Sequence, residues 1–335
     1  MTKAITTILL LLVFCKVNAQ DIHFTQFFAT PMFTNPAFTG HFEGTYRFSG
    51  IIRNQWASVS PQPFRTFGGG LDLNAPMNIK PIGIGFHIAQ DQAGLSSLTT
   101  TQLHGFLAGR VSISSKLKLH LGATAGIFQQ SIDFSQLSFG DQYNGIRYDP
   151  GQSTTDVNNT QPGLSKVNAG AGIFLERKTD ERNRVGVGFS IFNVTEPDRS
   201  FYSNTVNPLL RRNNIHLLSS IQLHSKWDLM PAVQFMQQGN QNEFLLGSSV
   251  RYHLNTGKVN PQSVQLGFWG RPEDAANISV GFQMNSLYIG GAYDVNLSTL
   301  KPATNYRGGW EFAVIYTIAT VQEKVKRLRQ CPDYL

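Results

Sequence analysis

Residues 117–127 of the chain read LKLHLGATAGI, so leucine, alanine and isoleucine alternate with charged, polar or small residues. Successive side chains of a β-strand point to opposite faces, whereas the side chains of a helix repeat every 3.6 residues. Alternation over this length therefore predicts a strand with one apolar face and one face of polar and small residues.

The same period of two recurs in fourteen segments along the chain. Strands of a soluble β-sandwich average about five or six residues, whereas strands that cross a membrane need about 9–11 residues. These segments have the longer length and carry aliphatic or phenylalanine side chains on one face, as contact with lipid requires. The sequence thus predicts an all-β fold, a transmembrane antiparallel β-barrel of about 14 strands. The predicted strands are 44–54, 65–74, 82–90, 99–113, 116–130, 166–177, 184–193, 213–224, 227–237, 243–254, 262–271, 276–285, 287–296 and 309–320.

The lengths of the connections support this count. Outer-membrane barrels have short turns at the periplasmic end and longer loops at the external end. If the first strand begins at the periplasmic end, the long connections 131–165, 194–212 and 297–308 all fall on the external side.

Composition excludes several other classes of protein. Charged residues make up 15% and hydrophobic residues 41% of the 335 residues, and the formal net charge is +7. Beyond residue 19 no run reaches the roughly 18 apolar residues that a membrane helix needs. Aromatic residues, at 11%, argue against disorder. Two cysteines exclude a disulfide framework and a multi-cysteine zinc site.

The chain divides into four predicted parts. Residues 1–19 have a positive start, a short apolar core and small residues at the end, which predicts a cleavable signal peptide. Residues 20–43 are an aromatic segment, residues 44–320 are the barrel, and residues 321–335 are a basic periplasmic tail that carries Cys331. Such a chain is expected in the outer membrane, in contact with its lipid and with no role in binding nucleic acid.

The aromatic segment contains six phenylalanines and two prolines. Burying one such aromatic side chain contributes about 1.5–3 kcal/mol, so these side chains need a buried partner. The segment is predicted either to plug the lumen or dock partners, or merely to pack against the barrel wall. Arg53, Asn54, Gln55 and Trp56, where the first strand reaches the external rim, pose a similar choice. One prediction is that these residues bracket the plug or a secreted client. The other is that Trp56 is an anchor at the lipid interface.

No catalytic residue, cofactor or metal site is predicted. A cluster of inward-facing histidines could bind a metal or support hydrolysis, but a role as hydrogen-bonded lumen residues is favoured. A lipid-acting barrel enzyme needs a serine and a histidine that face lipid, and the pattern offers none. The acidic loop 131–165 lacks EF-hand spacing, so a solvated loop is favoured over a calcium site. The histidines on inward faces are His87, His104, His120, His216, His224 and His253.

Four short motifs stand out: QFFATP at residues 26–31, NPAFTG at 35–40, RNQW at 53–56 and the terminal Cys331-Pro332. Together they resemble the PorP/SprF family, outer-membrane components associated with the type IX secretion system of Bacteroidetes. The resemblance implies a non-enzymatic component of that system.

Within that family, the resemblance implies a scaffold for the secretion or surface attachment of a large adhesin or another type IX client. It equally implies a partner in the secretion and gliding machinery, such as a periplasmic peptidoglycan-linked lipoprotein. The alternative is a passive porin for small solutes, against which the low charge of the predicted inward faces argues mildly. The residues predicted to bind partners are Phe27, Phe28, Pro31, Asn35, Pro36, Phe38, Arg53, Asn54, Gln55, Trp56 and Cys331.

Overall fold

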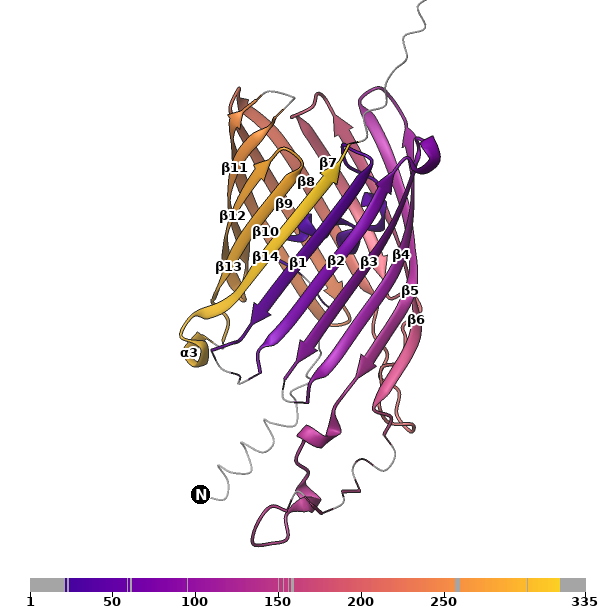
Figure 1. The fold of residues 1–335 in the computed structure, drawn as a ribbon, viewed down its shortest axis with the longest axis vertical. Coiled ribbons are helices and arrows are strands. Elements are labelled where there is room, and N and C mark those ends of the chain that lie inside the picture. Colours follow the sequence, from indigo (N-terminus) through magenta and orange to yellow (C-terminus); the bar gives the residue numbers. More distant parts are fainter. Residues whose placement is uncertain are drawn as a thin grey trace, which may run out of the picture.

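Fourteen antiparallel strands close into one barrel in the computed structural model of the protein, because the first strand pairs with the last (Figure 1). The structure describes residue 22 and residues 24–319, apart from 59, 61, 95, 150, 153, 156, 158–159, 257–259 and 300. The predicted signal peptide at 1–19, the tail at 321–335 and Cys331 lie outside the described residues.

The predicted fold class and strand count are confirmed. No strand end differs by more than three residues from its predicted position. The strands are β1 (Tyr46–Gln55), β2 (Phe64–Asn74), β3 (Ile82–Ala93), β4 (Leu98–Ser112), β5 (Leu117–Ser131), β6 (Gly163–Lys178), β7 (Arg184–Phe192), β8 (Arg212–His224), β9 (Trp227–Gln238), β10 (Gln241–Asn255), β11 (Gln262–Arg271), β12 (Ala275–Met284), β13 (Leu287–Asn296) and β14 (Arg307–Ile318).

The two ends of the barrel differ in their connections. The long connection between β5 and β6 extends from the lower end in Figure 1, where α3 (Lys301–Thr304) also lies. Short turns join the strands at the other end. Long loops of outer-membrane barrels are external, so we call the long-loop end the outer end and the opposite one the inner end.

Alternation along each strand separates an apolar exterior from a polar interior. On β12, Ile278, Val280 and Phe282 are exposed on the outside, whereas Asn277 and Ser279 are buried inside. Outward aromatic residues lie near strand ends, as Trp227 and Tyr252 do at the inner end, where their rings pack at a tilt with centroids 4.6 Å apart. An apolar surface bounded by aromatic residues is the exterior that a lipid bilayer requires. No helix among the described residues is long and apolar enough to cross a membrane.

Residues 24–43, which we call the lumen segment, lie inside the barrel (indigo helices within the barrel in Figure 1). Pro31 and Pro36 each open a new helical turn, since proline fits the first helical position but not the interior. The segment therefore folds as three separate turns, η1 (Phe27–Ala29), α2 (Pro31–Thr34) and η2 (Pro36–Phe38). The remaining turns are η3 (Pro76–Asn78), η4 (Phe134–Gln136) and η5 (Gly140–Gln142), all in connections between strands.

Candidate functional site

The lumen segment is attached to the last two strands near the outer end. The backbone amides of Thr25 and Gln26 donate to the two carboxylate oxygens of Glu311 on β14, each at 2.9 Å. The Thr25 hydroxyl donates to the carboxylate of Asp294 on β13 at 3.4 Å. One carboxylate thus pairs two backbone donors that the lumen would otherwise leave unsatisfied.

Glu311 and Asp294 belong to a buried cluster of four charges. The Arg53 guanidinium lies 3.3 Å from the Asp294 carboxylate and 3.5 Å from that of Glu311. Arg271 on β11 lies 2.8 Å from the same Asp294 oxygen. All four side chains are at most 3% exposed, and two positive charges balance two negative ones. The inward faces therefore carry more charge than the sequence indicated, but here the charges are paired, as buried charges must be.

Asn35 joins the middle of the segment to the facing wall. Its side-chain amide donates to the Ile173 carbonyl on β6 at 3.1 Å and to the Phe189 carbonyl on β7 at 3.3 Å. Its Oδ1 accepts from the Ala37 amide at 2.9 Å, which caps η2. Asn35 is fully buried, so these bonds satisfy a polar side chain that has no access to solvent.

Inward-facing glycines on β5 and β6 let η2 approach the wall. A Cβ on Gly122 would collide with the backbone of Pro36, and a Cβ on Gly172 would collide with the Asn35 side chain. The absence of side chains at these two positions is therefore what allows the NPAF turn to lie directly on the strands.

Substituting Gly122 tests this contact. We expect Gly122→Val to destabilise the folded protein by about 1–3 kcal/mol, because the new side chain must displace η2. Gly109→Val is the matched control, since nothing lies within 4 Å of a Cβ at Gly109. Urea unfolding in detergent, with limited proteolysis of residues 24–43, measures both variants. Equal stability of the two would contradict the packing described here.

Aromatic side chains of the segment pack against the wall of the lumen. Phe38 packs edge-on against Phe174 of β6, with ring centroids 4.7 Å apart, and Phe27 against Trp269 of β11 at 5.7 Å. Phe28 packs against Tyr288 of β13 at 6.0 Å. The predicted aromatic residues thus contact different walls of the barrel.

Arg212 at the start of β8 holds the segment through charge and backbone contacts. Its guanidinium lies 4.6 Å from the Phe33 ring centroid and 4.6 Å from that of Phe192. It also donates to the carbonyls of Ile22 at 2.8 Å and Phe33 at 3.2 Å. Sequence reasoning missed Arg212, although its inward phase on the strand is a signal that could have identified it.

At the inner end the segment leaves the lumen beside a second buried ion pair. Arg47 donates to both carboxylate oxygens of Asp72, at 2.9 and 2.7 Å, and to the Phe38 carbonyl at 3.1 Å. The Gly40 amide donates to the same Asp72 at 2.8 Å. Gly40 has φ +69°, so it makes the turn towards β1 in a conformation that other residues rarely adopt.

The residues predicted at the external rim separate from one another. Arg53 points into the buried charge cluster, and Asn54 lies on the outward face. Gln55 and Trp56 line a cavity of about 230 Å³ at the outer end, together with Asn296 of β13. Trp56 packs against Phe64, with ring centroids 4.9 Å apart.

A second cavity, of about 290 Å³, lies between the lumen segment and the inner half of the wall. Phe27, Phe38 and Trp269 form its apolar side, and Glu176 and Arg184 line it as charged groups. Next to it, His41, His120 and Glu176 form a group that could hold a metal ion. Six of the eleven predicted partner-binding residues therefore lie together on the lumen segment: Phe27, Phe28, Pro31, Asn35, Pro36 and Phe38. Of the four at the rim, Arg53 shares the Glu311 carboxylate with Thr25 and Gln26 of the segment, whereas Asn54 lies apart on the outward face.

The closed barrel, its apolar exterior and its occupied lumen define the protein as an outer-membrane β-barrel. Residues 16–316 match the family model described as "Type IX secretion system membrane protein PorP/SprF". The chain therefore belongs to the PorP/SprF family of type IX secretion membrane proteins, and the resemblance of its motifs is confirmed. The comparison with curated proteins found no match.

Two solved structures of similar shape are described as a transporter and a channel. The Pseudomonas putida toluene transporter TodX is 12% identical, with a TM-score of 0.52, over 86% of this chain and 92% of that chain. The CymD monoaromatic hydrocarbon channel is 8% identical, with a TM-score of 0.50, over 87% of this chain and 93% of that chain. At this level of identity the similarity shows a shared fold alone.

Proposed function

We propose that this barrel is a non-catalytic scaffold of the type IX secretion system, in which the lumen segment closes the pore. The observation that carries the proposal is the attachment of this segment to opposite walls. Thr25 and Gln26 bind Glu311 of β14, and Asn35 binds the backbone of β6 and β7. A segment attached in this way resists displacement by solutes and presents a rigid platform to partners.

On this proposal the chain is exported by a cleavable signal peptide, and its external loops hold a large secreted adhesin or another type IX client. The connection between β5 and β6 is the best candidate, because functional contacts concentrate in long loops. It has local order of its own. Asp141 accepts from the Thr155 amide at 2.8 Å and from the Thr154 hydroxyl at 3.0 Å, and these bonds lower the pKa of its carboxyl group.

At the inner end, the proposed partner is a periplasmic peptidoglycan-linked lipoprotein. β14 ends at the inner end, and on this proposal the basic tail with Cys331 binds that partner. The carboxyl-terminal contact and the external contact are separate parts of the scaffold and are separable by truncation.

Shortening the external loop tests the outer contact. We expect replacement of residues 134–160 by a short Gly/Ser linker to abolish co-purification of the secreted client from native outer membrane. The barrel should remain folded, because the loop lies outside the strands. Replacement of residues 57–62, in the shorter connection between β1 and β2, is the control and should retain the client. Full retention of a stoichiometric client by the loop variant would reject this loop as the dock.

Passage of small solutes is the second candidate function. TodX and CymD are described as a toluene transporter and a monoaromatic hydrocarbon channel. The specific observation in its favour is the 290 Å³ cavity, which aromatic side chains line on one side. A transporter must open a path past the lumen segment, so conductance measurements distinguish the two functions.

A further inference from the structure

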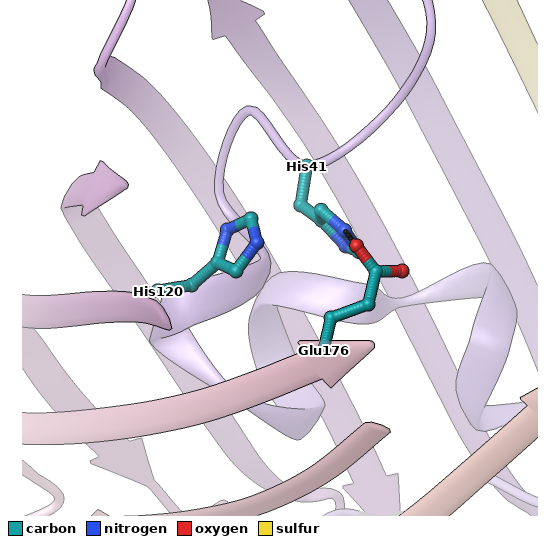
Figure 2. Close-up of side chains that lie close together, drawn as sticks. All are labelled: His41, His120 and Glu176. Carbon is teal, nitrogen blue, oxygen red and sulfur yellow. Dashed lines mark hydrogen bonds and ion pairs between the residues drawn. The ribbon is translucent and has the colours of Figure 1, made fainter. Parts of the chain in front are cut away.

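Three potential metal ligands meet where the lumen segment leaves the barrel (Figure 2). His41 comes from the segment, His120 from β5 and Glu176 from β6. Their ligand atoms all lie within 4.8 Å of one another, and His41 Nε2 is 3.1 Å from Glu176 Oε2. The three residues thus come from three parts of the chain and converge on one point.

The hydrogen bonds of the three residues leave one ring nitrogen unsatisfied. His41 and Glu176 pair with each other, but His120 Nε2 is buried and has no hydrogen-bond partner among the described residues. The His120 side chain is only 3% exposed. A buried polar atom without a hydrogen-bond partner is unfavourable, so this nitrogen calls for a partner that the described part of the chain does not supply.

We propose that His41, His120 and Glu176 bind a divalent transition-metal ion, with Zn²⁺ as the best fit. Two imidazoles and one carboxylate are the ligand types that zinc takes. In a tetrahedral site with bonds of about 2.0–2.2 Å, neighbouring ligand atoms lie about 3.4 Å apart. The His41–Glu176 separation is close to this value, and a small movement of His120 closes the remaining distance.

The surroundings supply both rigidity and access. The rings of His41 and His120 pack at 4.4 Å between centroids, and His41 also stacks on Phe38 at 5.9 Å. Phe174 packs against both histidines, at 5.6 and 6.0 Å. The 290 Å³ cavity borders His41 and Glu176, so a water molecule from that side can complete the coordination as the fourth ligand.

The affinity for the metal ion would come from the three ligands themselves and not from a negative electrostatic potential around them. Arg47 and Arg184 line the same cavity, although Arg47 is already paired with Asp72. The bound ion would join the lumen segment to β5 and β6 at one point. Its role is therefore to fix the inner end of the segment, independently of any contact with a secreted client.

Zinc binding to the purified, full-length barrel tests the proposal. The protein is prepared in detergent with a histidine-free affinity tag, stripped with a chelator, and titrated with Zn²⁺ against a chromogenic chelator. We expect one tightly bound equivalent and a higher thermal midpoint. His120→Gln and Glu176→Gln should weaken binding by about 100-fold or more, since even loss of an outer-shell partner costs about 10–100-fold.

His216→Gln is the matched control. His216 is also buried and packs against Phe38 and Phe174, but it lies outside the ligand group. This variant should bind Zn²⁺ like the wild-type protein. The proposal fails if the wild-type barrel binds Zn²⁺ no more tightly than His120→Gln does. It also fails if all variants bind Zn²⁺ equally, which is the result expected if histidines elsewhere on the surface bound the ion. In either case His41 and Glu176 form a simple ion pair.

Discussion

Deletion of residues 24–40 should turn a closed barrel into a conducting pore. In planar bilayers we expect the wild-type protein to show little current, and the deletion variant to raise single-channel conductance by about tenfold or more. The physical reason is size, because barrel diameter grows with strand number and fourteen strands enclose a wider lumen than the eight whose own side chains fill it. In this protein the segment that lies inside the lumen is a single contiguous part of the chain.

A milder variant tests closure of the lumen in case the deletion prevents the barrel from folding. Asn35→Ala with Phe38→Ala keeps the chain length but removes the bonds to Ile173 and Phe189 and the packing on Phe174. We expect intermittent openings rather than a steady pore. A large steady current through the wild-type protein would contradict closure by the lumen segment and favour passage of solutes. Migration of unheated samples on gels confirms that each variant is folded.

Substitution of Arg53 should produce the largest loss of stability among single changes in the lumen. Arg53→Met leaves Asp294 and Glu311 with only Arg271 to balance their charge. Breaking a buried ion pair by removing one partner costs about 3–5 kcal/mol. Urea unfolding in detergent micelles measures the change in the free energy of unfolding.

The double variant Arg53→Met, Glu311→Gln separates charge from packing. It again balances one positive with one negative charge, so we expect it to recover part of the lost stability. Lys178→Ala is the exposed control, because its partner Glu43 is 80% exposed, and it should leave stability unchanged. If Arg53→Met behaved like Lys178→Ala, the buried cluster would not contribute to stability.

The strands could be predicted from sequence because lipid outside and a polar lumen inside impose the same alternation on every one of them. β5 and β12 show why: their apolar residues stay in phase over the whole strand, and only the ends shift by a residue or two. Strand ends are less certain, since β6 begins three residues before its predicted start, in polar sequence that shows no alternation.

The contacts within the lumen could not be predicted in the same way. Asn35 was selected by its motif, but its bonds to β6 and β7 depend on glycines more than 80 positions away that admit η2. Arg53 was expected at the rim, whereas it is buried against Glu311, 258 positions further along the chain. His41 carried no signal at all, because it lies outside any strand and its neighbours His120 and Glu176 come from two different strands.

The attachment of Thr25 to Glu311 also constrains the order of assembly. These two residues are 286 positions apart, and Glu311 lies on the final strand, which closes the barrel against β1. Contacts between distant parts of a chain form late, after the intervening chain has been ordered. The backbone amides of Thr25 and Gln26 therefore reach their acceptor only when the last strand is present. This attachment therefore distinguishes a barrel with all fourteen strands in place from an incomplete one.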